Sequence, residues 1–464
     1  MKDYDILIRE LLKDNINMND ILSAKIKGND IKICVIGLGQ VGLPTALTFC
    51  KSGCVVIGHD INNLLLSNLK SKKPPFHESG LDNLLTECID SKKLMLTENL
   101  SYAVNNSDVL IICVATPITT DVLPDLSYLQ NVCKSISEFS LVNKLVIVES
   151  SIPPGTFEKI VIPILTKNNK LGTEFWVAFV PERLAPGHAL SEIQTTPRVI
   201  GYVDINSGNL AKKLYEKIVK NEVLLAPVQI VEISKLVENT YRDVNVALAN
   251  EISIICDEYG IDVSELIKIC NSHPRVKLLS PGPGVGGPCL PKDPYLLLNP
   301  QGKKSISSKI ILESRKINDN MPYHVVNLIN ETLNLQHKIP SKTTVLILGT
   351  AYKANVSDTR FSPAKEIISQ LVKNGYTVQV FDPNTTENFG GTTTSDMWKA
   401  MSGSDMLVVL TDHDEFRKLN LSEIKKHMKE NPILVDTKRI FDKNKAKDLG
   451  IHYVAVGYSN RSKT

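Results

Sequence analysis

The feature that most constrains the fold is a glycine-rich turn between a predicted strand and a predicted helix. Residues 31–37 predict a buried strand, the turn runs from Gly37 to Gly42, and residues 43–52 predict a helix. A second strand is predicted over residues 54–60, which completes a βαβ unit. Because parallel strands joined by helices need both faces of their sheet covered, this unit predicts an α/β layer structure.

Strand and helix patterns alternate along most of the remaining chain. Between Gly208 and residue 272 the patterns are helical with few strand signals, and a helical pattern resumes over residues 307–335. The other predicted strands are residues 109–115, 145–150, 175–180, 344–348, 377–381, 406–411 and 433–436, and a helix is predicted over 363–374. The sequence therefore predicts an α/β fold with two Rossmann-like domains, each a doubly wound parallel sheet, joined by a central all-α domain.

Composition and charge restrict the class of protein. The 464 residues are 42% hydrophobic and 22% charged, which excludes a disordered, collagen-like or coiled-coil protein. A formal net charge of +3 argues against nucleic acid or an anionic membrane as the main partner. No apolar run approaches the ~20 residues that span a bilayer.

The cysteines and the N-terminus indicate a cytoplasmic chain. The nine cysteines follow no paired spacing, and several sit in apolar runs, where a thiol behaves as a small hydrophobic group. We therefore expect a reducing compartment, with no disulfide framework and no metal site. The first residues lack the pattern of a signal peptide. Residues 1–29 form a polar extension in which four apolar side chains predict one face of a docking helix: Ile6, Leu7, Leu11 and Leu12.

The glycine-rich turn predicts a dinucleotide site, because it follows a strand and opens a helix. Gly37 allows the tight turn, Gly39 lets the backbone approach a diphosphate, and Gly42 lets helix and strand pack closely. The diphosphate would lie on the N-terminus of the helix. Asp60 ends the second strand, where a carboxylate accepts from ribose hydroxyls and repels a 2′-phosphate, which favours NAD over NADP. The alternative is a tight turn without a ligand.

A second candidate site is Cys289, which lies in a loop rich in glycine and proline. The density of Gly and Pro over residues 280–294 excludes regular structure and builds a specific loop. A nucleophilic thiolate needs access and nearby positive charge, and Lys292 follows closely. A loop cysteine can also be incidental, and the spacing alone does not decide between the two.

Two further segments carry polar side chains in suggestive patterns. Lys235, Asn239 and Arg242 share one face of a predicted helix, where they could polarise an alcohol and hold an anion, or form a solvated surface. Lys353 and Arg360 follow the first strand of the C-terminal domain, where the glycine pattern is missing. Their charges suit a diphosphate rather than a second dinucleotide site.

Taken together, these motifs resemble the UDP-glucose/GDP-mannose dehydrogenase family of nucleotide-sugar 6-dehydrogenases. The resemblance extends from about residue 31 to residue 457. The segments that carry it follow in order along the chain: 37–42, 114–117, 150–155, 181–183, 232–242, the Cys289 loop and 358–360. Residues 181–183 and 281–287 have the forms of the N-acetylhexosamine branch of the family.

The resemblance implies a role for each matching position. Cys289 would be the nucleophile and Lys235 the acid/base residue, while Glu182 and Asp293 would order water or orient Lys235. The positions that would hold NAD are Gly37, Gly39, Gln40, Val41, Gly42, Asp60, Thr116, Ser151 and Arg360. The positions that would hold the nucleotide sugar are Arg183, Leu184, Lys235, Asn239, Arg242, His273, Arg275, Gly286, Tyr352, Lys353 and Lys438. Ser151 stands where the family more often has Thr, and Pro288 where a His is common.

The implied organisation and activity follow from the same resemblance. The expected parts are an N-terminal extension (1–29), an NAD-binding domain (30–207), a central helical domain that forms a homodimer (208–335) and a C-terminal UDP-sugar-binding domain (336–464). The expected reaction is a four-electron oxidation of the C6 hydroxyl of a UDP-N-acetylhexosamine to the uronic acid. The alternatives are UDP-N-acetylglucosamine or UDP-glucose as the particular substrate, a two-electron β-hydroxyacid dehydrogenase, and a non-catalytic NAD-binding regulator.

Overall fold

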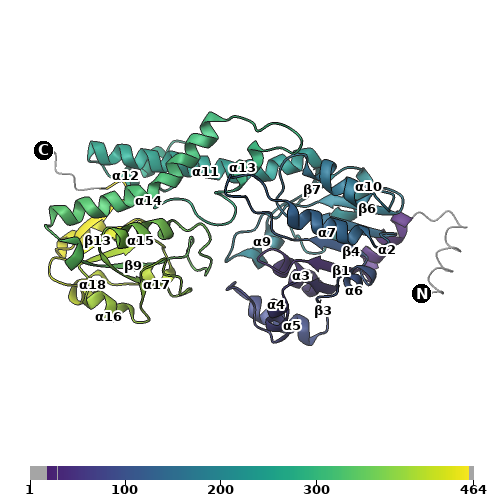
Figure 1. Ribbon diagram of the computed structural model, residues 1–464, viewed down its shortest axis with the longest axis horizontal. Coiled ribbons are helices and arrows are strands. Elements are labelled where there is room, and N and C mark those ends of the chain that lie inside the picture. Colours follow the sequence, from purple (N-terminus) through teal and green to yellow (C-terminus); the bar gives the residue numbers. More distant parts are fainter. Residues whose placement is uncertain (1–17, 29, 459–464) are drawn as a thin grey trace, which may run out of the picture. The chain divides into compact units, whose positions relative to one another are not determined.

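The computed structural model describes residues 18–28 and 30–458, and these form two compact units (Figure 1). The first unit comprises the described residues up to 237 together with residues 295–306, and the second comprises residues 238–294 and the described residues from 307 onward. The predicted docking helix of Ile6, Leu7, Leu11 and Leu12 lies outside the described residues.

An eight-stranded sheet forms the centre of the first unit. Its strands lie in the order β3-β2-β1-β4-β5-β6-β7-β8, and all neighbours are parallel except β6 and β7. The strands are β1 (Lys32–Ile36), β2 (Val55–His59), β3 (Leu94–Thr97), β4 (Val109–Ile112), β5 (Lys144–Val148), β6 (Phe175–Phe179), β7 (Arg198–Tyr202) and β8 (Val223–Pro227). The order 3-2-1-4-5-6 is that of a doubly wound dinucleotide-binding sheet, so the prediction of a Rossmann-like domain is confirmed.

Alternate side chains of each strand enter two separate cores, because helices cover both faces of the sheet. On β1, Ile33 and Val35 belong to one core, and Cys34 and Ile36 belong to the other. The first face is covered by α2 (Met18–Gly28), α3 (Gly42–Lys51), α4 (Asn63–Lys70), α5 (Leu81–Asp90), α9 (Ala189–Thr195) and α10 (Ile205–Tyr215). The second face is covered by α6 (Leu100–Asn105), α7 (Ser127–Ser137), the π-helical turn η2 (Phe157–Val161), α8 (Ile162–Leu165) and the start of α11 (Val228–Tyr259).

The described part of the N-terminal extension is a helix that packs on this unit. Leu22 and Ile26 of α2 are fully buried in the first core. The ammonium of Lys213 on α10 donates to the Ser23 hydroxyl over 2.7 Å.

One segment differs from the sequence-based expectation. The patterns predict helices and few strands after Gly208, yet β8 is a strand that pairs in parallel with β7 at the edge of the first sheet. The physical reason is that β8 is an apolar run that ends in Pro227 and is followed directly by α11, and periodicity alone does not separate such a run from the start of a helix. Its pairing with β7 provides the missing stabilisation.

A six-stranded parallel sheet forms one layer of the second unit, in the order β11-β10-β9-β12-β13-β14. Its strands are β9 (Thr344–Leu348), β10 (Thr377–Phe381), β11 (Thr392–Thr393), β12 (Met406–Val409), β13 (Ile433–Asp436) and β14 (His452–Ala455). This order repeats that of the first six strands of the chain, so the prediction of a second Rossmann-like domain is confirmed. On one face lie α14 (Lys309–Leu335) and α15 (Pro363–Lys373), and on the other α16 (Met397–Ser402), α17 (Asp414–Arg417), α18 (Leu421–His427) and α19 (Lys443–Asp448) (Figure 1).

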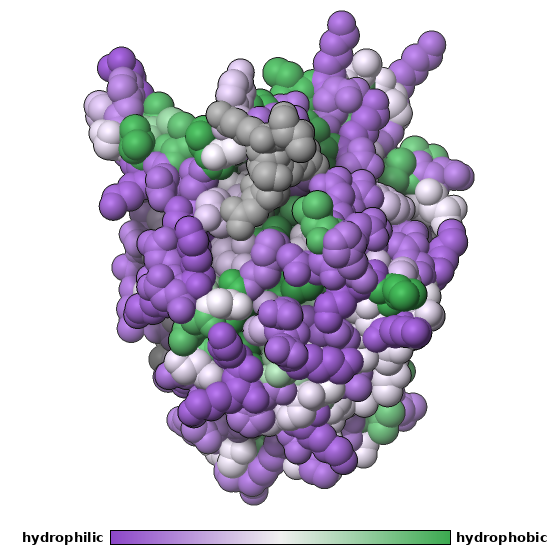
Figure 2. All heavy atoms as spheres, turned by 90° about the vertical axis from the view of Figure 1, so that its left-hand side faces the viewer, coloured by the Kyte–Doolittle hydropathy of each residue, from purple (hydrophilic) through white to green (hydrophobic). Residues whose placement is uncertain are grey.

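Two long helices, α11 and α14, make up most of the central part of the chain, and α12 (Val263–Cys270) and α13 (Asp293–Leu298) are short. The helical pattern over 307–335 is confirmed by α14, and α11 lies within the helical region predicted after Gly208. None of the helices in the described ranges is long and apolar enough to cross a membrane. The face drawn in Figure 2 is mainly hydrophilic, with hydrophobic residues in small separate groups.

Candidate functional site

The predicted dinucleotide turn has the geometry that its glycines suggest. Gly37 has a φ of +93°, and a Cβ there would lie 2.9 Å from the carbonyl oxygen of Cys113. A Cβ on Gly42 would lie 1.8 Å from the carbonyl oxygen of Gly37. No atom lies within 4 Å of a Cβ built on Gly39, so the backbone at Gly39 faces open space. The turn can therefore admit a ligand at Gly39. It has no room for a side chain at Gly37 or at Gly42.

Asp60 organises the same turn from the end of β2. One carboxylate oxygen accepts from the Leu38 N–H over 2.8 Å, and the other accepts from the Asn62 N–H over 2.9 Å. Helix α3 begins directly after Gln40 and Val41, and no side chain caps its N-terminus. Helix N–H groups and a neighbouring carboxylate are the groups that bind the diphosphate and ribose of a dinucleotide.

The turns that follow β4 and β5 are tied to each other. The Thr116 hydroxyl donates to the carbonyl of Ser151 over 2.6 Å, and the Ser150 hydroxyl donates to the carbonyl of Val114 over 2.6 Å. Both turns follow the carboxyl ends of parallel strands, where ligands bind in sheets of this type. The structure thus brings together Thr116 and Ser151, two of the predicted cofactor residues.

Lys235 lies on α11 in the part of that helix that belongs to the first unit, and its side chain is 5% exposed. One turn earlier, Glu232 is fully buried and accepts from the N–H groups of Gly155 and Phe157, over 2.7 and 2.8 Å. The predicted sugar-nucleotide residues Arg183 and Leu184 lie in the loop after β6, where an Arg183 Nη donates to the carbonyl of Pro197 over 3.1 Å.

In the second unit, the loop of Cys289 is packed against the segment that follows β9. Gly287 has a φ of +89°, and a Cβ there would lie 2.6 Å from the ring of Tyr352. A Cβ on Gly286 would lie 2.8 Å from the Tyr352 Cβ. The Gly287 N–H donates to the carbonyl of Arg360 over 2.9 Å. Glycine is therefore required at two successive positions just before the partly exposed Cys289.

A tight turn follows Cys289 and presents an acid to α11. The carbonyl of Cys289 accepts from the N–H groups of Lys292 and Asp293, over 3.0 and 2.8 Å. The Asp293 carboxylate is fully buried and accepts from the Asn239 amide over 2.6 Å. The ammonium of Lys292 lies 3.8 Å from the other oxygen of Asp293. Asn239 and Asp293, predicted from separate motifs, are thus in direct contact.

Several charged groups gather around Cys289 in this unit. Asp358 binds the guanidinium of Arg360 through Nε and Nη2, over 2.9 and 2.6 Å, and raises the pKa of Arg360. Burial raises the pKa of the Tyr352 phenol, and the nearby Asp358 and Cys289 act in the same direction. Arg242 acts on Tyr352 in the opposite direction.

The predicted sugar-nucleotide residues differ in burial: the side chain of Lys438 is partly buried, whereas His273 and Arg275 are exposed. Burial lowers the pKa of the Lys438 ammonium, although Asp412 lies 3.8 Å away and raises it. The ammonium of Lys438 also lies 4.0 Å from a Cβ built on Gly282, at the start of the Cys289 loop. By contrast, His273 and Arg275 are exposed in the turn after α12, and the Arg275 N–H donates to His273 Nδ1 over 3.3 Å.

Sequence reasoning missed a buried polar network that supports the Cys289 loop. The side-chain Oδ1 of Asn250 accepts from the Gly282 N–H, and its Nδ2 donates to the side-chain Oδ1 of Asn318, each over 2.9 Å. Asn318 in turn donates to Asp243 over 2.9 Å, and Arg315 donates to the same carboxylate over 2.6 Å. All four side chains are at most 2% exposed. Their positions within helical patterns gave no signal, because polar residues there usually face solvent.

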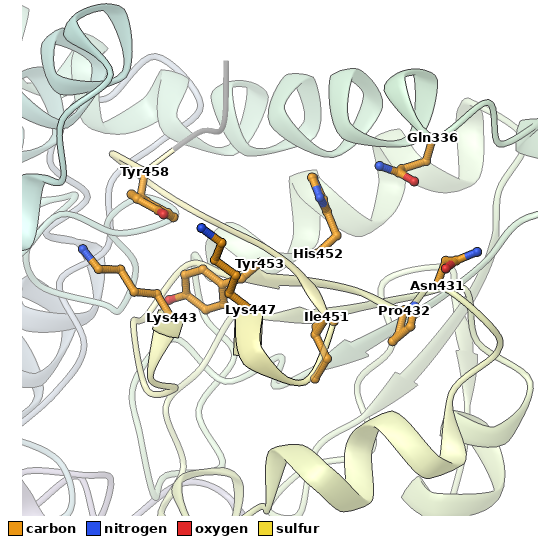
Figure 3. Close-up of a pocket in the computed structure, with 10 residues that line it drawn as sticks. Gln336, Asn431, Pro432, Lys443, Lys447, Ile451, His452, Tyr453 and Tyr458 are labelled. Atoms are coloured by element: carbon orange, nitrogen blue, oxygen red, sulfur yellow. The ribbon is translucent and has the colours of Figure 1, made fainter. Parts of the chain in front are cut away.

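A cavity of about 400 Å³ lies elsewhere in the second unit, beside β14 and α19 (Figure 3). The ammonium of Lys443, on its rim, is held by Asp262 and Glu265 over 2.6 Å each. The residues that line it are Gln336, Asn431, Pro432, Lys443, Lys447, Gly450, Ile451, His452, Tyr453 and Tyr458. None of the predicted site residues is among them, so this cavity is separate from the predicted chemistry.

Comparison with known proteins finds family matches over three segments of the chain. Residues 31–219, 229–320 and 346–443 match, respectively, the NAD binding domain, the central domain and the UDP binding domain of the UDP-glucose/GDP-mannose dehydrogenase family. The chain is 40% identical to a UDP-N-acetyl-D-mannosamine dehydrogenase from Pyrococcus horikoshii, over 88% of this chain and 96% of the relative.

Two solved structures have the same fold. The structure of the UDP-D-ManNAc dehydrogenase from Pyrococcus horikoshii has a TM-score of 0.85 and 38% identity, over 93% of this chain and all of that chain. A UDP-N-acetyl-mannosamine dehydrogenase from Staphylococcus aureus has a TM-score of 0.80 and 34% identity, over 92% and 98% of the two chains. The open backbone at Gly39 and the carboxylate of Asp60 fit the cofactor of such enzymes. The chain belongs to the UDP-glucose/GDP-mannose dehydrogenase family and is an NAD-dependent dehydrogenase.

Proposed function

We propose that this enzyme oxidises the C6 hydroxyl of UDP-N-acetyl-D-mannosamine to the carboxylate, giving UDP-N-acetyl-D-mannosaminuronate. The observation that carries the proposal is the placement of Cys289 in a glycine-bounded turn whose acid, Asp293, is bonded to Asn239. The substrate is supported by the relatives, since the proteins of about 40% identity are named UDP-N-acetyl-D-mannosamine dehydrogenases.

The first unit would hold the cofactor. The N–H groups at the start of α3, near Gln40 and Val41, would bind the diphosphate, and Asp60 would accept from the ribose hydroxyls. Thr116 and Ser151 would border the nicotinamide end. Arg360 remains a proposed cofactor contact from the family motif at residues 358–360. NAD held by these residues would supply the hydride acceptor, and the four-electron oxidation would need two such acceptors in turn for each sugar.

Cys289 would make the second oxidation possible. Its thiolate adds to the C6 aldehyde and forms a thiohemiacetal, whose remaining C–H bond can give up the second hydride. The resulting thioester is hydrolysed by water, which releases the carboxylate and regenerates the thiol. Lys235 would take the proton of the C6 hydroxyl in the first oxidation and stabilise the later oxyanions.

The remaining residues would position the sugar nucleotide. Lys353 and Lys438 would neutralise the diphosphate, and Arg242 and Tyr352, which lie near each other, would border the sugar end. The other proposed contacts are Arg183, Leu184, Asn239, His273, Arg275 and Gly286. The match of residues 346–443 to a UDP binding domain supports this division of roles.

We also propose a homodimer formed through α11. In the second unit this helix exposes apolar residues at helical spacing, namely Tyr241 (62%), Leu248 (44%), Ile255 (49%) and Tyr259 (71%). A long exposed apolar stripe of this kind favours a partner helix.

We also propose a cytoplasmic location. The apolar surroundings of cysteines such as Cys34 and Cys133 support a reducing compartment of this kind.

A substrate comparison tests the proposed reaction. The purified protein should be assayed in parallel with UDP-N-acetylmannosamine, UDP-N-acetylglucosamine and UDP-glucose, with NADH followed by absorbance and the acid by mass spectrometry. We expect the highest kcat/KM with UDP-N-acetylmannosamine and two NADH per sugar. One NADH per sugar would indicate a two-electron dehydrogenase, and no turnover with any of the three would favour a non-catalytic regulator.

A further inference from the structure

A buried carboxyl group connects the turn of residues 150–157, which follows β5, to the helix of Lys235. Glu232 is fully buried on α11, three residues before Lys235. Its two oxygens accept separately from the backbone N–H groups of Gly155 and Phe157. These N–H groups open the helical segment of η2 and α8, and the first N–H groups of a helix have no partners within the helix. A carboxylate is a strong acceptor for them and interacts favourably with the helix dipole.

The turn that Glu232 holds is otherwise poorly anchored by secondary structure. It runs from the end of β5 through Pro153 and Pro154 to Gly155, which has a φ of +82°. On its other side, the Gln301 N–H donates to the Pro154 carbonyl over 2.9 Å. The same turn contains Ser151, whose carbonyl accepts from Thr116.

We propose that Glu232 is a positioning residue. It fixes the turn of residues 150–157 against α11 and so sets the position of Ser151, in that turn, relative to Lys235. The inference rests on the proposed function in one respect, namely that Ser151 and Thr116 border the bound NAD. Both carboxyl oxygens of Glu232 are occupied by backbone N–H groups of the turn. Glu232 acts through backbone atoms, so its loss should weaken cofactor binding before it changes the affinity for the sugar nucleotide.

A glutamine substitution tests the positioning role with little change in volume. The amide of Glu232→Gln can accept only one of the two N–H bonds, and its NH₂ group faces the other donor. We expect the dissociation constant for NAD, measured by calorimetry on the full chain without sugar, to rise about tenfold. The KM for the sugar nucleotide should stay within about twofold of wild type.

A second buried clamp in the same unit provides a matched control. Glu78 is 3% exposed and accepts from the N–H groups of Gly187 and Ala189, over 2.7 and 2.8 Å, in the same manner as Glu232. Glu78→Gln removes an equivalent bond but leaves the turn of residues 150–157 untouched. An equal loss of NAD affinity in both variants would mean general loosening of the unit and would overturn the proposal.

A third variant covers the case in which Glu232→Gln does not fold. Glu232→Asp keeps the charge but is one methylene too short to reach both N–H groups, so we expect an intermediate NAD affinity. NAD binding at wild-type strength in a folded Glu232 variant would refute the inference. Because binding is measured without sugar, wild-type protein that binds NAD but oxidises no UDP-sugar would contradict the proposed function alone.

Discussion

Burial and hydrogen bonding act in opposite directions on Glu232, and burial has the larger effect. It raises the pKa of this carboxyl to about 7 from 4.5, while the N–H groups of Phe157 and Gly155 lower it. Between these values the folded protein holds the proton more tightly than the unfolded chain does. The free energy of unfolding must therefore fall as the pH rises from about 4.5 to about 7, by at most about 3 kcal/mol from this group. Urea unfolding of wild type and Glu232→Gln, at about pH 5 and about pH 8, measures this change in the free energy of unfolding. The wild type should lose stability relative to the variant at the higher pH, and a constant difference would contradict the assignment.

The thiol of Cys289 gives a second test at the scale of a single residue. Cys289→Ser keeps the size of the side chain but removes the nucleophile, so we expect acid formation to fall by at least about a hundredfold. Affinities for NAD and the sugar nucleotide should remain near those of wild type, since the residues proposed to bind them are intact. The test measures the number of NADH molecules formed per sugar by absorbance and the mass of the product by mass spectrometry. Two NADH per sugar at the wild-type rate would exclude Cys289 as the nucleophile.

At the scale of elements, the helices α11 and α14 fix the Cys289 loop through the network of Asn250, Asn318, Asp243 and Arg315. Asn250→Ala would leave the Gly282 N–H and the Asn318 carbonyl buried without partners, at a cost of about 1–3 kcal/mol each. We expect a lower melting temperature and a kcat reduced about tenfold or more. The affinity for NAD should not change. Asn245→Ala is the matched control, because Asn245 lies on the same helix and its amide donates only to the Tyr241 carbonyl of its own helix.

The elements also show how far sequence patterns reach. The strands β1, β4, β9 and β12 were predictable because they are continuous apolar runs, as strands buried on both faces must be. The strands β3, β8 and β14 at the sheet edges, and β7 next to an edge, gave no clear signal, since pairing in the sheet defines them more than composition does. The same limit applies to the site. Cys289 and Lys235 stand in recognisable motifs, but Asp243 and Arg315 are far apart in sequence and meet only in the fold.

At the scale of the whole molecule, the proposed dimer is the feature open to direct measurement. Leu248→Lys combined with Ile255→Lys places two charges in the middle of the apolar stripe of α11, where a partner helix would have to bury them. We expect light scattering to give the mass of one chain for this variant and of two chains for wild type. Tyr128→Lys, at a 51% exposed position in the first unit, serves as the control and should remain dimeric. A monomeric wild type would exclude the dimer.

The close fit of Gly286 and Gly287 to Tyr352 has a practical consequence for redesign. A side chain at either glycine would overlap the tyrosine or its neighbours by close to an ångström, so the loop and the ring can change only together. Libraries that vary the two glycines without Tyr352, or Tyr352 without the glycines, should yield mostly variants in which the Cys289 loop is misfolded. Work on new sugar specificities would do better to randomise these three positions jointly, and to keep the thiol fixed while doing so.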